Sequence, residues 1–489
     1  MIINDMENKI HKAARWNAIA EISSKLIVPI TNMILARLLV PEIFGIIATI
    51  SMIISFSDML SDAGFQKYLI QAEFLTEKEF NKHATVAFWS NIAISITLTF
   101  IIITARREIS SLIGNSGHET ALAVASLQII VSSFSSIQFA ILKHKLSFKA
   151  IFYSKLVGII TPFLITIPLA IIGYGYWSLI IGSLSTQVFT FVVLLFQVNW
   201  RPGLYFNFKI LKSMLVFSMW AFLESFSVWL SAWVDIFIIG SLFSNYYTGL
   251  YRTSLNLVNS IIAVIVAVII PVLYSALSRA KNDITFFKEI FFQLQKTTAY
   301  ITFPLSLGLF MYRDLATQLF LGNSWSEASF IIGIWSITSG VKLVLSDMNN
   351  ECFRASGKPK IAFFIQFSHI FFLIPACYIG AKNGFENLVV TRTLIRFQLI
   401  ITSIIAMHLY MKITILEIFK NIVKPLIFTI LMGILLVVLN LLPDLLGYSI
   451  LSILLGGIFY VLLVFKFAIK DLHIIINIFI SRKSNKEIS

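Results

Sequence analysis

Apolar runs of 20 or more residues recur along the whole sequence, and no long polar stretch separates them. A helix needs about 20 mostly apolar residues to cross the roughly 30 Å of hydrocarbon in a bilayer. Only 13% of the residues are charged, about half the share in soluble proteins, so a soluble fold is excluded. We therefore predict an all-α polytopic membrane protein with fourteen transmembrane helices. They are expected at residues 16–39, 43–65, 83–104, 120–142, 148–171, 175–197, 213–239, 247–275, 297–312, 328–348, 361–380, 386–409, 425–442 and 447–465.

The basic residues alternate between the two sides of this predicted topology. Connections on one side, together with both termini, carry 27 of the 38 Lys and Arg residues, whereas the opposite connections carry four. Short cytoplasmic loops are enriched in Lys and Arg, so both termini are predicted to be cytoplasmic. The net charge of +14 is spread over eight short connections, and this pattern disfavours a nucleic-acid partner.

An internal repeat divides the chain into two halves. Trp16 and Trp220 stand 204 residues apart, and the same offset carries the segment Leu38–Gly45 onto Leu242–Gly249. The matches predict an N-lobe of helices 1–6 (residues 1–205), a C-lobe of helices 7–12 (206–410), and helices 13 and 14 with a basic tail (411–489). Since each half has an even number of helices, the pseudo-two-fold axis runs along the membrane normal. Parallel repeats of this kind are typical of transporters, whose substrates bind between the repeats.

Thirteen ionisable residues lie inside the predicted spans. A charge at a lipid-facing helix centre costs about 2.5–3.5 kcal/mol on insertion scales, so these groups should face a protein-lined interior. Residues near span ends can extend their charged groups toward water instead. The residues near span ends are Arg37, Asp62, Asp235, Arg252 and Asp347.

Two arginines in the twelfth span give the sharpest signal. Arg392 and Arg396 are four residues apart, which places them on the same face of the helix, where like charges repel. An anionic group should therefore balance them. Their partner could be a carboxylate of a neighbouring helix, or a substrate phosphate, which the planar guanidinium binds well. Glu21 and Lys25 have the same spacing in the first span and could form an intrahelical pair.

Sequence signals for enzymatic, metal or cofactor chemistry are missing. The segment Ser356–Pro359 lacks the upstream glycine and the hydroxyl residue of a phosphate-binding loop, and His118 and Glu119 do not continue into a zinc-binding HExxH motif. The longest outer connection, residues 105–119, leaves no room for a catalytic domain. We therefore expect no enzymatic activity, no metal and no cofactor.

The turn between the first two helices, Ala36–Gly45, resembles an R-L-L-x-P-x-x-F-G motif, and Asp62–Phe65 is similar to the end of the second helix in the same family. With the fourteen spans and two six-helix halves, the chain resembles the Wzx-type polysaccharide-export flippases of the multidrug/oligosaccharidyl-lipid/polysaccharide (MOP) exporter superfamily. The resemblance implies a V-shaped, alternating-access flippase in the cell inner membrane. Its substrate would be an undecaprenyl-pyrophosphate-linked repeat unit of O-antigen, capsule or a related polysaccharide, moved from the cytoplasmic to the periplasmic leaflet. The resemblance is also compatible with a polysaccharide polymerase and chain-length proteins as partners.

The resemblance further implies a cationic cavity bordered by helices 1, 2, 7 and 8. In this sequence the basic residues inside the spans match it, and we expect them to bind the pyrophosphate and the sugars. Acidic residues inside the spans are candidates for coupling to protons or sodium. The cationic candidates are Arg392, Arg396, Lys25, Lys155, Arg252 and Lys342, and the acidic ones are Glu21, Asp58 and Glu224.

Three other functions fit the same pattern. A drug or cation antiporter of the MATE type shares the fold but should have an acidic cavity, whereas seven of the thirteen ionisable residues here are basic. A peptidoglycan lipid-precursor flippase fits both the charge and the number of spans. A membrane scaffold that transports nothing would have an interior without solvent access.

Overall fold

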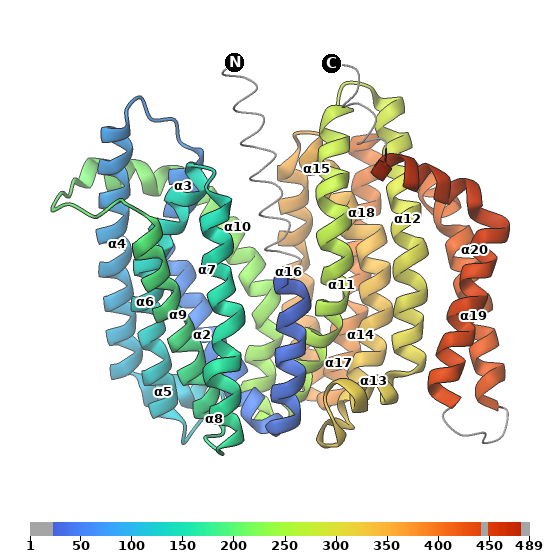
Figure 1. The fold of residues 1–489 in the computed structure, drawn as a ribbon, viewed down its shortest axis with the longest axis horizontal. Coiled ribbons are helices and arrows are strands. Elements are labelled where there is room, and N and C mark those ends of the chain that lie inside the picture. The colour runs from blue at the N-terminus through green and yellow to red at the C-terminus, as the bar shows by residue number, and fades with distance from the viewer. Residues whose placement is uncertain (1–22, 442–447, 481–489) are drawn as a thin grey trace. The chain divides into compact units, whose positions relative to one another are not determined.

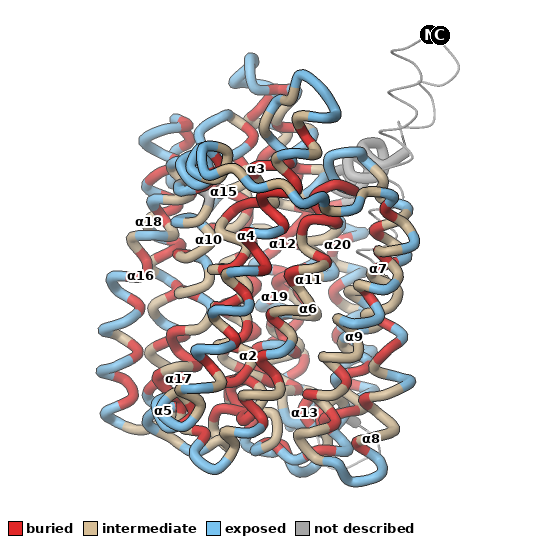
Figure 2. Tube along the Cα trace, turned by 90° about the vertical axis from the view of Figure 1, so that its left-hand side faces the viewer, coloured by how far each residue is buried: buried red, intermediate tan, exposed pale blue. Residues whose placement is uncertain are grey.

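The computed structural model describes residues 23–441 and 448–480, which form helices joined by short connections, with no strand among them (Figure 1). The predicted all-α fold is therefore confirmed. Contacts between Cα atoms divide the chain into unit 1 (Met1–Thr253) and unit 2 (Ser254–Ser489), each with its own buried core. Buried residues alternate with exposed ones along most helices, as expected for helices with one packed face (Figure 2).

Unit 1 is built around α6, which contacts α2, α3, α4, α5, α7 and α9. Pro41 begins α2, a position where proline costs no hydrogen bond. A π-helical turn, Pro162–Thr166, interrupts the helix that contains α7 and α8. The unit comprises helical residues 23–38, α2 (Pro41–Asp62), α3 (Phe65–Gln71), α4 (Glu77–Thr104), α5 (Arg106–Leu112), α6 (Glu119–His144), α7 (Phe148–Thr161), α8 (Ile167–Ile171), α9 (Tyr176–Gln197), α10 (Phe208–Leu242) and the first residues of α11 (Asn245–Arg279).

Unit 2 packs α12 against α14, α19 and α20, while α16 packs against α17. A second π-helical turn, Leu343–Asp347, separates α14 from α15. The unit comprises the rest of α11, α12 (Ile284–Met311), α13 (Arg313–Phe320), α14 (Ala328–Lys342), α15 (Met348–Ala355), α16 (Pro359–Lys382), α17 (Phe385–Leu394), α18 (Arg396–Met411), α19 (Ile415–Leu441) and α20 (Tyr448–Ile480).

Twelve helices in the described part of the chain are long and apolar enough to cross a membrane. They match twelve of the fourteen predicted spans. The first predicted span begins at residue 16, outside the described residues, and is helical over residues 23–38. The ninth lies in α12, which is a long helix but carries Gln293, Gln295 and Lys296 in its middle. The total of fourteen stays a prediction.

Two glycines that the internal repeat aligns, Gly45 and Gly249, lie at a tight crossing inside unit 1. A Cβ atom on Gly45 would collide with the carbonyl oxygen of Asn245, and one on Gly249 would collide with that of Pro41. Pro41 and Asn245 are themselves 204 residues apart, so the contact is reciprocal, as at a two-fold axis. This geometry supports the predicted repeat. The lobe boundaries stay a prediction, and the packing division falls at residues 253 and 254.

Candidate functional site

The two arginines of the twelfth span meet one tryptophan ring in unit 2. Arg392 lies in the last turn of α17, and Arg396 is the first residue of α18. The guanidinium carbon of Arg396 lies 3.9 Å from the ring centroid of Trp335 on α14, and that of Arg392 lies 5.4 Å from it. Both arginines are buried. A cation over an indole face is attracted by the ring's electron density, more strongly where water is excluded.

Hydroxyl groups of α14 complete the binding of Arg396. Its Nη1 donates hydrogen bonds to Thr338 Oγ1 at 2.9 Å and to Ser339 Oγ at 3.0 Å. These hydroxyls and the indole ring are neutral groups that position the guanidinium. The arrangement therefore brings two buried guanidiniums to the same indole ring in unit 2, and the guanidinium group is well suited to binding phosphate.

Lys342, a predicted pyrophosphate ligand at the end of α14, forms an ion pair with Asp347. Its Nζ lies 2.5 Å from Asp347 Oδ1. The π-helical turn Leu343–Asp347 explains this pairing, because i to i+5 turns place residues five apart on the same face. A headgroup that bound Lys342 would have to compete with this carboxylate.

A polar cavity of about 240 Å³ lies inside unit 1 and contains both Asp58 and Asp62 of α2. Ser132 Oγ donates a hydrogen bond to Asp58 Oδ1 at 2.6 Å, and Ser136 Oγ donates one to Asp62 Oδ1 at 3.2 Å. Each serine of α6 stands 74 residues after its aspartate, so α2 and α6 run in the same direction, as the predicted topology requires. The hydroxyl of Ser135, which also lines the cavity, has no hydrogen-bond partner.

A second cavity in unit 1, of about 400 Å³, contains Glu224. The Nζ of Lys67 lies 3.4 Å from both Glu224 Oε2 and Ser225 Oγ. Beside this cavity, the guanidinium carbon of Arg252 lies 4.1 Å from the ring centroid of Trp233, one of the lining residues. Arg252 is thus held as the arginines of unit 2 are, by an indole ring.

The predicted site residues therefore occupy several places. Asp58 and Glu224 line different cavities, and Lys25 and Lys155 are half-buried on other helices of unit 1. Glu21 lies outside the described residues. Arg392 and Arg396 are the pair that the structure brings together. A single chamber shared by cations of both lobes stays a prediction.

Sequence reasoning missed several residues of these sites. Asp62 was interpreted as a helix-end charge, although Asp58 and Asp62 share a helix face and Ser132 and Ser136 offer a matching pair four residues apart. That paired spacing was the available signal. No sequence signal pointed to Lys67 or Trp335. Their partners, Glu224 and Arg396, lie 157 and about 60 residues away in the sequence.

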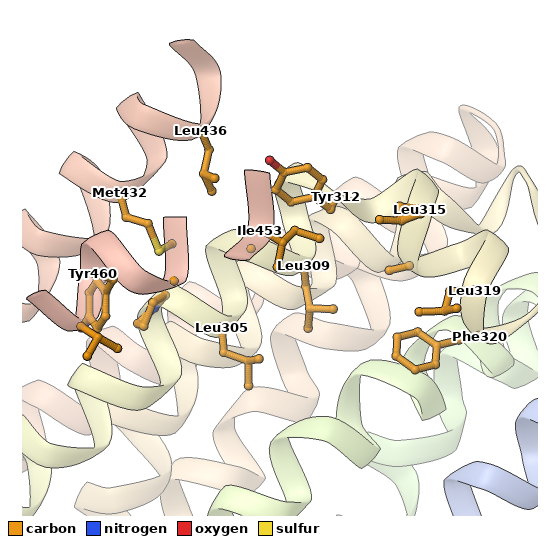
Figure 3. A pocket seen from close by; sticks show the side chains of 15 residues that line it. Leu305, Leu309, Tyr312, Leu315, Leu319, Phe320, Met432, Leu436, Ile453 and Tyr460 are labelled. Atoms are coloured by element: carbon orange, nitrogen blue, oxygen red, sulfur yellow. The ribbon is translucent and has the colours of Figure 1, made fainter. Parts of the chain in front are cut away.

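An apolar cavity of about 390 Å³ lies within unit 2, between α12, α13, α19 and α20 (Figure 3). Leu305, Leu309, Leu319, Met432 and Ile453 are among the residues that line it. Its size lies within the range of small-molecule sites, and its lining is suited to a hydrocarbon chain.

Comparison with known proteins decides the family. Residues 34–330, more than half of the chain, match the family described as "Polysaccharide biosynthesis protein". The chain belongs to this family. It is 23% identical over 473 residues to an "Uncharacterized membrane protein in cps region" of Klebsiella pneumoniae, covering 94% of this chain and 95% of that protein. It is 22% identical over 388 residues to the "Lipopolysaccharide biosynthesis protein WzxC" of Escherichia coli (strain K12), covering 77% and 76%.

Solved structures show the fold. The structure titled "Lipid II flippase MurJ, inward closed conformation" superposes with a TM-score of 0.75 at 16% identity, over 91% of this chain and 97% of the other. An inward-facing multidrug resistance MATE family transporter of the MOP superfamily gives a TM-score of 0.62 at 14% identity, over 83% and 98%. The family match confirms the predicted polysaccharide branch, and the solved structures confirm the predicted fold. The chain is a multi-pass protein of the inner membrane.

Proposed function

We propose that this protein is a flippase that carries an undecaprenyl-pyrophosphate-linked oligosaccharide from the cytoplasmic to the periplasmic leaflet by alternating access. Its membership of a polysaccharide biosynthesis family, at nearly full length against its relative from a cps region, supports a role in polysaccharide assembly. The many short connections between its apolar helices support transport and not catalysis. Both termini lie in the cytoplasm in this proposal, and a polymerase is a further partner.

The arginine pair on Trp335 is the observation that supports an anionic substrate. A pyrophosphate headgroup carries roughly two negative charges and loses its hydration on entering the membrane interior, so it needs charge-assisted hydrogen bonds there. Arg392 and Arg396 offer two forked donors, and the indole and hydroxyl contacts fix at least one of them in position. In a cell with a negative interior, moving each negative charge outward gains about 2.3 kcal/mol per 100 mV.

The apolar cavity of unit 2 supports a lipid substrate. Hydrocarbon binds there without losing polar contacts, because the lining is almost entirely aliphatic and aromatic. We propose that one segment of the prenyl chain lies between α12 and α19 while the remainder stays in the bilayer.

The acidic cavity of unit 1 supports coupling to a cation. Two carboxylates four residues apart on one helix repel each other when both are ionised, and a proton or a sodium ion would relieve the repulsion. We therefore propose that Asp58 and Asp62 together form the coupling site. Asp62 takes the role that the sequence analysis gave to Glu224. Among the described residues no group of three or more His, Cys, Asp or Glu gathers as a metal site would require.

The acidic cavity also favours a second candidate, a drug or cation antiporter, since the MATE fold matches this chain. The two functions differ in the charge of the transported molecule. A substrate panel of lipid-linked oligosaccharide, peptidoglycan lipid precursor and a fluorescent organic cation separates flippase, cell-wall flippase and antiporter directly.

The test is translocation by the purified protein in vesicles. Wild-type protein should accelerate translocation of the lipid-linked oligosaccharide. The double variant Arg392→Ala/Arg396→Ala should translocate it at least about tenfold more slowly, which corresponds to about 1.4 kcal/mol. Arg313→Ala is the matched control, because Arg313 also lies over an aromatic ring of unit 2, that of Phe310. Undiminished translocation by a well-folded double variant would remove the pair from the headgroup site.

A further inference from the structure

Four aromatic side chains form a row along one face of α10. Phe222, Phe226, Trp229 and Trp233 are separated by four, three and four residues, the spacing of one helix face. At about 1.5 Å per residue the row extends roughly 16 Å along the helix, about half of a bilayer's hydrocarbon thickness. All four side chains are partly exposed, neither buried in the core nor fully open. We call these residues the α10 aromatic row.

The ring planes of the row are close to parallel. Phe222 and Phe226 have centroids 6.4 Å apart and planes 21° apart, and Phe226 and Trp229 have centroids 6.5 Å apart and planes 20° apart. Three contacts fix the tryptophan end. The ring centroid of Phe56 lies 4.7 Å from that of Trp229, with the ring planes 45° apart. Trp229 Nε1 donates a hydrogen bond to Ser55 Oγ at 3.0 Å, and Arg252 lies over Trp233. Phe222, Phe226 and Trp229 thus share a similar ring orientation along α10.

Polar groups accompany the rings at this end. Trp229 and Trp233 line the 400 Å³ cavity that also contains Lys67, Glu224 and Ser225. An ammonium, a carboxylate and a hydroxyl supply both donors and acceptors within one cavity. Aromatic faces with a few convergent polar groups are the composition of a binding site for a molecule that is apolar on one face and polar at its edges.

We propose that the α10 aromatic row and the Lys67–Glu224 cavity bind the sugar rings of the lipid-linked substrate. This inference rests on the proposed function and assigns the glycan to unit 1. A pyranose ring has a face of C–H groups and a rim of hydroxyls, so its face packs on the negative face of an aromatic ring while its rim exchanges hydrogen bonds with Lys67, Glu224 and Ser225. Stacking tolerates different sugars, because every pyranose presents C–H groups.

A simple lipid-facing surface would not explain these residues. An ion pair placed against hydrocarbon pays the desolvation cost of both charges, yet Lys67 and Glu224 lie in the same cavity as the two indoles. The polar pair and the aromatic row together therefore indicate a hydrated ligand.

The experiment compares binding of two lipids to the full chain in nanodiscs. The probes are undecaprenyl pyrophosphate and the undecaprenyl-pyrophosphate-linked oligosaccharide extracted from cells that lack this protein. Wild-type protein should bind the glycan-bearing lipid about tenfold more tightly. The double variant Trp229→Ala/Trp233→Ala should bind the two lipids equally, and its affinity for undecaprenyl pyrophosphate should not change.

Two controls separate the row from a general loss of folding. Trp89→Ala removes another partly exposed indole of unit 1, whose Nε1 donates to the Gly203 carbonyl at 2.9 Å, and it should keep the preference for the glycan-bearing lipid. Trp229→Phe/Trp233→Phe keeps the rings and should also keep most of that preference. The inference is overturned if the double alanine variant keeps the preference, or if wild-type protein has none. Failure of wild-type protein to bind either lipid overturns the proposed function as well.

Discussion

Unit 1 and unit 2 hold buried ionic groups of opposite sign by similar means. In unit 1, serine hydroxyls of α6 donate hydrogen bonds to the carboxylates of Asp58 and Asp62. In unit 2, hydroxyls of α14 and the ring of Trp335 receive the guanidinium of Arg396, with Arg392 near the same ring. In each unit, neutral hydroxyl groups contribute to positioning the charged side chains. Because the charged groups are acidic in unit 1 and basic in unit 2, we propose that unit 1 binds a cation and unit 2 an anion.

The largest expected effect is on the stability of the cationic pair. Trp335 is buried, and Trp335→Ala would leave a cavity and remove the ring under the guanidiniums. Truncating a buried aromatic side chain costs about 3–5 kcal/mol, so the melting temperature of the variant should fall clearly. Trp335→Phe keeps a ring and should recover part of the loss. If Trp335→Ala melts like wild-type protein, the ring does not hold the pair.

A second prediction concerns the acidic pair of unit 1. Asp58→Asn/Asp62→Asn removes the like-charge repulsion and keeps the side-chain size, so the protein should fold at least as well as wild type. Translocation in vesicles should no longer respond to an imposed proton or sodium gradient, whereas wild-type translocation should respond several-fold. Asp235→Asn is a useful control, because Asp235 is buried elsewhere in unit 1 and accepts a hydrogen bond from Tyr251. An unchanged gradient response in the double variant would refute the assignment.

The smallest expected effect is at the ion pair of Lys67 and Glu224. The side chain of Lys67 is 40% exposed and that of Glu224 is 50% exposed. Exposed ion pairs contribute about 0–1 kcal/mol to the free energy of unfolding. Lys67→Met/Glu224→Gln should therefore leave the melting temperature within a few degrees of wild type. A large loss of stability would show that this pair is a structural element and would weaken its role in binding a hydrated ligand.

Sequence reasoning predicted the fold better than the sites, and particular residues show why. Apolar length defines each transmembrane helix locally, so twelve of the predicted spans could be found one by one. The spacing of Arg392 and Arg396 correctly indicated a shared face. Their ring partner could not be found, because which helix covers that face depends on packing between segments about 60 residues apart.

The π-helical turns are a second limit of sequence reasoning. The predicted tenth span treats residues 328–348 as one regular helix, in which Lys342 and Asp347 would point in different directions. The extra residue in the turn Leu343–Asp347 brings them together. No residue type in that segment marks such a turn, and the helices on either side of it pack against different partners, α14 against α12 and α15 against α16.

The most direct test of the account is the affinity of the purified protein for undecaprenyl pyrophosphate, which carries the charged headgroup without sugars. The account predicts that Arg392→Gln/Arg396→Gln lowers this affinity at least about tenfold, equal to 1.4 kcal/mol, while Arg313→Gln leaves it unchanged. Equal affinities for wild-type protein and a folded double variant would contradict the claim that the arginine pair on Trp335 receives the headgroup.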